Sequence, residues 1–188
     1  MKLIWFPEKI GLCADRDNDA LPSCRLAVET AVVRHGTPLF LPGWSEAWRG
    51  TVGVGVIVDR LGRHIDRRFA GRYYGRAVLA VKAMPENQAY SAPAYADALF
   101  SLDGSILVSS PFELSETSAA LEAAGVSSCA GADLTQVFDA AVSMASRAFT
   151  LHTGDVIIAG EITDVPLVAE TRLTFSIGDT TILTHKIK

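Results

Sequence analysis

The chain has 188 residues, of which 49% are hydrophobic and 20% charged, with a formal net charge of -4 at pH 7. This size and balance are typical of one packed globular domain, and the acidic charge argues against nucleic acid and anionic membranes as partners. No apolar run reaches the roughly 18 residues that a membrane-spanning helix needs, and the apolar stretch at Met1–Phe6 is too short for a signal peptide.

The cysteines are odd in number and widely spaced, which favours reduced thiols: Cys13, Cys24 and Cys129. We therefore expect a cytoplasmic protein. No repeat or linker divides the chain, so residues 1–188 are predicted to form a single domain. Within it, residues 1–37 are predicted to be an N-terminal strand and helix, and residues 38–188 the core.

Three helices are predicted. The first covers residues 23–35, where apolar residues recur at helical spacing from Cys24 to Val32 and Gly36 follows as a stop. The second covers residues 115–124, an alanine-rich stretch. The third covers residues 133–149, because Asp133 is a good N-cap and Gln136 completes a capping box.

Most of the remaining chain is predicted to be strand. Apolar side chains alternate with glycines in residues 52–58, and short apolar runs follow at residues 77–82, 105–109 and 156–159. Residues 173–187 are typical of a hairpin that turns at Gly178. Strands with a few separated helices indicate an α+β fold with a large mixed or mainly antiparallel sheet, and not a doubly wound βαβ fold.

Five segments carry a resemblance to a known family. In chain order they are Pro38–Leu41, Val54–Ile65, Ala70–Ala80, Phe100–Ser105 and Arg147–Gly160. In the same order they are similar to segments of the fumarylacetoacetate hydrolase superfamily. The resemblance implies a β-rich mixed-sheet roll of the type found in the family's C-terminal domain, assembled as a homodimer. Members of the family are hydrolases, isomerases, hydratases and decarboxylases of small 2-oxo and diketo acids.

The family binds Mg²⁺ or Mn²⁺ through a Glu-x-Glu pair and a downstream Asp, and hard cations of this kind prefer carboxylate oxygens. Carried over by the resemblance, the three positions fall on Thr51, Gly53 and Ala77, none of which has a carboxylate. The family's Lys falls on Phe100 and its loop Thr on Glu161. The chain is thus identified as a degenerate member, a pseudoenzyme with no metal or other cofactor. We expect that restoring Glu, Glu and Asp at the three positions would restore metal binding.

The alternative is a working enzyme with a rebuilt Mg²⁺ or Mn²⁺ site. Its candidate ligands are the nearby acids Glu46, Asp59, Asp103, Glu161 and Asp164, which are also typical of turns and surface loops. The family's catalytic His and Glu would lie within residues 13–36, where Glu29 and His35 are in range but cannot be assigned. Catalytic residues therefore remain unassigned.

Two arginines flank the missing ligands. Arg49 and Arg76 can bind a carboxylate or phosphate with a fixed guanidinium, or they can be ordinary surface residues. Six arginines between residues 60 and 76 are interpreted as a solvated hairpin and not as a nucleic-acid patch. Trp44 and Trp48 either pack or line a pocket.

Three functional hypotheses follow. The first is a binder of a small anionic metabolite resembling a 2-oxo acid, or a non-catalytic partner of an active relative. The second is the enzyme with a rebuilt metal site, and the third is a structural protein without a pocket. The candidate ligand-binding residues are Arg49, Thr51, Arg76, Asp103 and Glu161.

Overall fold

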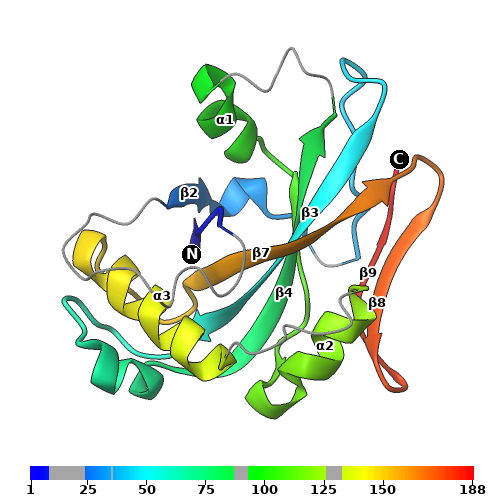
Figure 1. The fold of residues 1–188 in the computed structure, drawn as a ribbon. Helices are drawn as coiled ribbons and strands as arrows, with labels where there is room; N and C mark the ends of the chain where they lie inside the picture. The colour runs from blue at the N-terminus through cyan, green and yellow to red at the C-terminus, as the bar shows by residue number, and fades with distance from the viewer. Residues whose placement is uncertain (9–23, 35, 87–92, 126–132) are drawn as a thin grey trace.

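The structure is a computed structural model that describes residues 1–8, 24–34, 36–86, 93–125 and 133–188. The strands are β1 (Lys2–Trp5), β2 (Arg25–Val28), β3 (Trp48–Val58), β4 (Tyr74–Pro85), β5 (Ile106–Val108), β6 (Phe112–Glu113), β7 (Val156–Leu167), β8 (Arg172–Ile177) and β9 (Thr180–Lys186). A seven-stranded sheet has the order β2-β1-β7-β3-β4-β5, with β6 paired to β4 (Figure 1). Strands β8 and β9 form a separate hairpin. The sheet is mixed, because β1 is parallel to β7 and the other pairs of strands are antiparallel.

The helices are α1 (Pro93–Phe100), α2 (Thr117–Ala123) and α3 (Leu134–Ala148), with short 3-10 turns η2 (Glu29–Ala31), η3 (Arg67–Arg72) and η5 (Leu114–Glu116). The predicted third helix is confirmed as α3, and Asp133 caps it by accepting a 3.0 Å hydrogen bond from the Thr135 amide. Within the described chain, no helix is long and apolar enough to cross a membrane.

The two faces of the sheet carry different cores. Val52, Val54 and Val56 of β3 lie in the larger core together with side chains of α2, α3 and the β8–β9 hairpin. The opposite face carries a smaller core in which Trp5, Ile158 and Phe100 meet. Figure 1 shows α2 and α3 on one side of the long strands and α1 on the other. Strands β3 and β4 are thus buried on both faces over most of their length, which explains their nearly continuous apolar sequences, whereas β7 becomes partly exposed from Glu161 onwards.

The predicted helix over residues 23–35 is wrong for the part that the structure describes. Residues 25–28 form strand β2, which pairs with β1, and η2 follows. Ala27 is fully buried, whereas Leu26 and Val28 are 38% and 54% exposed, so burial alternates with a period of two. Pairing with β1 overrides the helical spacing of the apolar residues, and β-branched Val28 fits a strand well.

Candidate functional site

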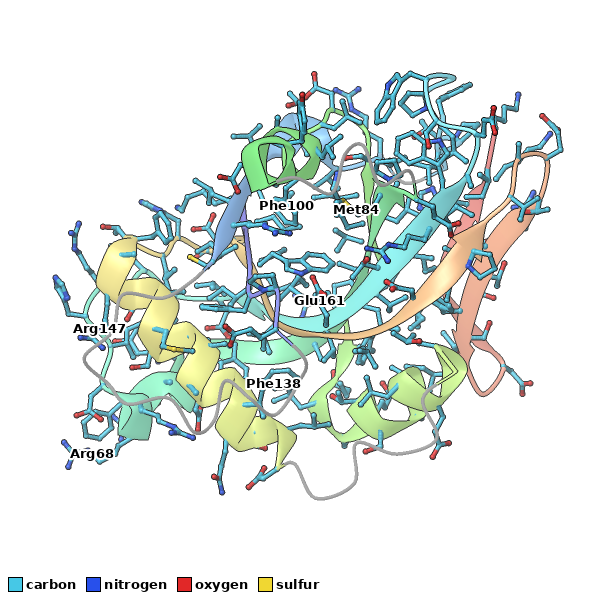
Figure 2. The ribbon with its side chains drawn as sticks, turned by 45° about the horizontal axis from the view of Figure 1, so that its top comes forward. Arg68, Met84, Phe100, Phe138, Arg147 and Glu161 are labelled. Carbon is cyan, nitrogen blue, oxygen red and sulfur yellow. The ribbon has the colours of Figure 1, made fainter. Side chains whose placement is uncertain are left out.

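A cavity of about 290 Å³ opens on the smaller-core face, beneath α1. Strands β1, β2, β3, β4 and β7 each contribute to its wall, and Phe100 contributes from the end of α1. Figure 2 shows Phe100, Met84 and Glu161 around this opening. The charged side chains that line it are Arg25, Arg49, Lys82 and Glu161. The cavity is therefore a polar site whose charged side chains all come from strands of the sheet.

The strand register explains why these side chains converge. Thr51 on the central strand β3 faces Lys82 on β4 and Asp164 on β7. Two residues further along β3, Gly53 faces Glu161 on β7. Directly opposed residues point to the same side of a sheet, so all of these positions lie on the cavity face.

Lys82 is the most unusual group at the cavity. The residue is only 1% exposed, and its Nζ donates a 2.5 Å hydrogen bond to Ser105 Oγ and lies 5.7 Å from the centre of the Phe100 ring. Ser105 in turn donates to the carbonyl oxygen of Leu102. Among the described residues no carboxylate forms an ion pair with Lys82. Burial disfavours the charged form and lowers the pKa of Lys82 to about 7.

The two carboxylates on the cavity face of β7, Glu161 in the wall and Asp164 beside it, are engaged by neighbouring side chains. Glu161 Oε1 accepts a 3.2 Å hydrogen bond from the indole nitrogen of Trp5, which is itself fully buried. Asp164 accepts a 2.8 Å hydrogen bond from the Thr51 hydroxyl and lies 3.6 Å from Arg49. The Arg49–Asp164 pair is nearly half exposed on both sides, so it holds the arginine only weakly.

The structure brings together three of the five candidate ligand-binding residues. Arg49, Thr51 and Glu161 all line the cavity. Arg76 lies far from them along β4, exposed and opposite Glu113 of β6. Asp103 is exposed in the turn between α1 and β5. Neither of these two residues lines the cavity.

The three positions assigned to the metal ligands do not converge. Ala77 faces Val56 on β3 and belongs to the larger core, so it lies on the opposite side of the sheet from Thr51 and Gly53. A carboxylate at position 77 would therefore not share a site with carboxylates at positions 51 and 53. A Cβ atom added to Gly53 would lie 2.5 Å from Ile158 Cγ2, so a Glu there would displace the core. The expectation that Glu, Glu and Asp at these positions would rebuild a metal site is incompatible with this packing.

The residues at the cavity also fit a hard dication poorly. Around Thr51 the neighbouring strands offer one hydroxyl, one carboxylate already bound to it, and the amine of Lys82. In the described ranges, no three His, Cys, Asp or Glu side chains gather in a way that could hold a metal ion. Of the proposed substitute ligands, Glu46 and Asp59 lie away from this cavity, in a surface loop and just after β3. On this face the described residues offer the carboxylates of Glu161 and Asp164, and both already accept hydrogen bonds from neighbouring side chains.

Sequence reasoning missed Lys82 and Arg25 as site residues. Lys82 ends the predicted strand 77–82, and the structure extends this strand to Pro85. A single lysine inside the apolar run Ala-Val-Leu-Ala-Val-Lys-Ala-Met was the available signal, because lysine is rarely buried without a partner. Arg25 was missed because residues 23–35 were predicted to be a helix, whereas Arg25 begins strand β2. Its guanidinium lies 5.7 Å from the centre of the Phe100 ring.

Comparisons with known proteins agree with this architecture. No family model and no curated protein sequence matches the chain. Among solved structures, a protein from Yersinia pestis described as a fumarylacetoacetate hydrolase family member is 15% identical with a TM-score of 0.72, covering 100% of this chain and 92% of its own.

Two enzymes of defined activity have a similar structure. A 5-carboxymethyl-2-hydroxymuconate delta-isomerase from Mycobacterium smegmatis is 13% identical with a TM-score of 0.71, covering 99% of this chain and 78% of its own. A fumarylpyruvate hydrolase from Pseudomonas aeruginosa, in complex with Mn²⁺ and pyruvate, is 15% identical with a TM-score of 0.67, covering 99% and 88%. The chain thus has the α+β mixed-sheet fold of the fumarylacetoacetate hydrolase family over its whole length.

Proposed function

We propose that this protein binds a small metabolite of the 2-oxo acid type in the cavity beneath α1, and that it does so without a divalent metal. The observation that carries the proposal is the charge of the cavity wall. Two arginines, Arg25 and Arg49, line it against one acidic lining residue, Glu161. A positive wall in a protein of net charge -4 favours an anionic ligand.

The two arginines suit a carboxylate. A guanidinium offers parallel N–H donors that match the two oxygens of a carboxylate. Arg25 stacks on Phe100 and forms no ion pair with any described residue, so its donors remain available to a ligand. The cavity volume of about 290 Å³ suits a metabolite of a few carbon atoms.

The proposal replaces the charge of a metal ion by fixed side-chain charge. The fumarylpyruvate hydrolase with the same fold was determined with Mn²⁺ and pyruvate. In this chain, Arg25 and Arg49 supply positive charge at the cavity, and the two carboxylates on the same face, Glu161 and Asp164, are already hydrogen-bonded to Trp5 and Thr51. We therefore favour metal-independent binding over a metal-dependent hydrolase, isomerase or decarboxylase.

Calorimetric titration of the purified protein with pyruvate and oxaloacetate, in buffer containing a chelator, tests the proposal. Saturable binding is expected, and Arg25→Gln should weaken it by about tenfold or more, as for the loss of a charge-assisted hydrogen bond. Arg60→Gln is the matched control, because Arg60 is an exposed arginine beyond β3 that pairs with Asp59. It should bind the ligand as the unmodified protein does.

Two outcomes contradict the proposal. If the protein binds neither pyruvate nor oxaloacetate, the proposed function is wrong. Binding that appears only after Mg²⁺ or Mn²⁺ is added supports the alternative, an active enzyme with a rebuilt metal site.

A further inference from the structure

We infer that Lys82 forms a covalent imine with the carbonyl carbon of the 2-oxo acid held in the cavity. The inference rests on the proposed function, since the ligand must first bind. It adds a chemical step performed by this chain's own residues.

Lys82 is placed where it can reach a ligand in the cavity. Its side chain lies on the cavity wall near the C-terminal end of β4, opposite Thr51 and on the same face as Glu161. The arginines enter the same cavity from β2 and β3. A carboxylate held by Arg25 or Arg49 would leave the adjacent carbonyl carbon inside the cavity that Lys82 lines.

The environment of the Lys82 amine favours its neutral, nucleophilic form. An amine attacks a carbonyl only when it is neutral, and burial lowers the pKa of Lys82 to about 7. At neutral pH the neutral fraction of Lys82 is on the order of a thousand times that of an exposed lysine with the ordinary value of 10.5. The Ser105 hydroxyl donates a hydrogen bond to the carbonyl oxygen of Leu102 and accepts one from Lys82 Nζ. This arrangement orients the amine without protonating it.

The other charged groups around the cavity are compatible with this state. Arg25 and Arg49 are positive, which does not favour a second positive charge nearby. The acidic groups on β7 are engaged elsewhere, Glu161 with Trp5 and Asp164 with Thr51 and Arg49. No described carboxylate pairs with Lys82 and holds it in the charged form.

The step balances without any further reactant. The lone pair of Nζ forms a bond to the carbonyl carbon, the π electrons of the C=O bond move to oxygen, and this oxygen takes up one of the two protons of the neutral amine. The resulting carbinolamine then loses its hydroxyl group together with the second proton of Nζ as water, and the C=N bond forms. One water is released for each imine, and hydrolysis reverses the step.

Reductive trapping tests the inference on the intact protein. Pyruvate and sodium cyanoborohydride should add to the protein the mass of pyruvic acid less one oxygen atom, and peptide mapping should place the adduct on Lys82. Lactate has the same carboxylate and no carbonyl, so it should compete with pyruvate and protect Lys82 from trapping. Lys82→Met should abolish this adduct. Lys188→Met is the control, because Lys188 is a surface lysine beside Phe40, and it should be trapped like the unmodified protein.

The outcomes separate this inference from the proposed function. Binding of pyruvate and lactate with equal affinity, without an adduct on Lys82, overturns the imine and leaves the binding function intact. Adducts spread over exposed lysines and unaffected by lactate also overturn it. If neither acid binds, the proposed function fails first. Should Lys82→Met fail to fold, the mapping and lactate protection in the unmodified protein still decide the question.

Discussion

Replacing Lys82 by Met should stabilise the protein, and by an amount that depends on pH. The ordinary pKa of 10.5, which applies to the unfolded chain, falls to about 7 in the folded protein because of burial. The folded state therefore binds fewer protons than the unfolded state between these two values. The destabilising effect of Lys82 is therefore absent above the unfolded-state pKa. It grows as the pH falls towards 7 and reaches its full size below that value.

The magnitude follows from the pKa difference. Each pKa unit corresponds to about 1.4 kcal/mol, so a charged Lys82 costs the folded state at most about 5 kcal/mol at acidic pH. Water entering the cavity reduces this cost. Met has a similar length and no charge, so Lys82→Met should raise the free energy of unfolding by several kcal/mol near pH 6, and by about 2 to 3 kcal/mol less near pH 9.

The assay is urea unfolding of both proteins at about pH 6, 7.5 and 9, followed by circular dichroism. The difference between the two proteins cancels the contribution of other titrating groups, which both share. A stability difference that stays constant across this range would refute the reasoning, because it would mean that Lys82 titrates alike in the folded and unfolded states. Lys188→Met serves as the control, and its effect should not vary with pH.

Three further predictions concern the scaffold. Asp155→Asn should destabilise the protein by about 2 to 4 kcal/mol in chemical denaturation. The substitution removes the charge of a nearly buried carboxylate that forms an ion pair with Lys2 Nζ at 2.6 Å. Gly53→Ala should cost about 1 to 3 kcal/mol by the same assay, since the added carbon would lie 2.5 Å from a core side chain. Tyr74→Phe should lower the free energy of unfolding by about 1 kcal/mol, because the Tyr74 hydroxyl donates a 2.9 Å hydrogen bond to Asp139. Unchanged unfolding midpoints would contradict each of these.

Much of the fold could be predicted because its signals are local. The alternation in residues 52–58 and the capping residue Asp133 depend on neighbouring positions, and both correspond to observed elements, β3 and α3. The prediction at residues 25–28 failed because pairing with β1, which is distant in the sequence but adjacent in the sheet, decides that segment. Local periodicity cannot show such a pairing when apolar residues are frequent.

The site was harder to predict because it depends on register. Glu161 and Asp164 are three residues apart, which in a regular strand places them on opposite faces. The register of β7 against β3 shifts between Val52 and Gly53, and this irregularity brings both acids to the cavity face. The same dependence on register explains why Ala77 was placed beside Thr51 when it lies on the other side of the sheet.

The burial of Trp5 gives the cavity an internal optical reporter. The chain has three tryptophans, and the other two, Trp44 and Trp48, contact each other with ring centroids 4.9 Å apart, outside the cavity lining. In a Trp44→Phe, Trp48→Phe double variant, all indole emission would come from Trp5. This ring is fully buried, donates a hydrogen bond to Glu161 and packs against Phe100. A ligand entering the cavity would change the polarity around that single fluorophore, so its emission could follow occupancy in real time and without a label.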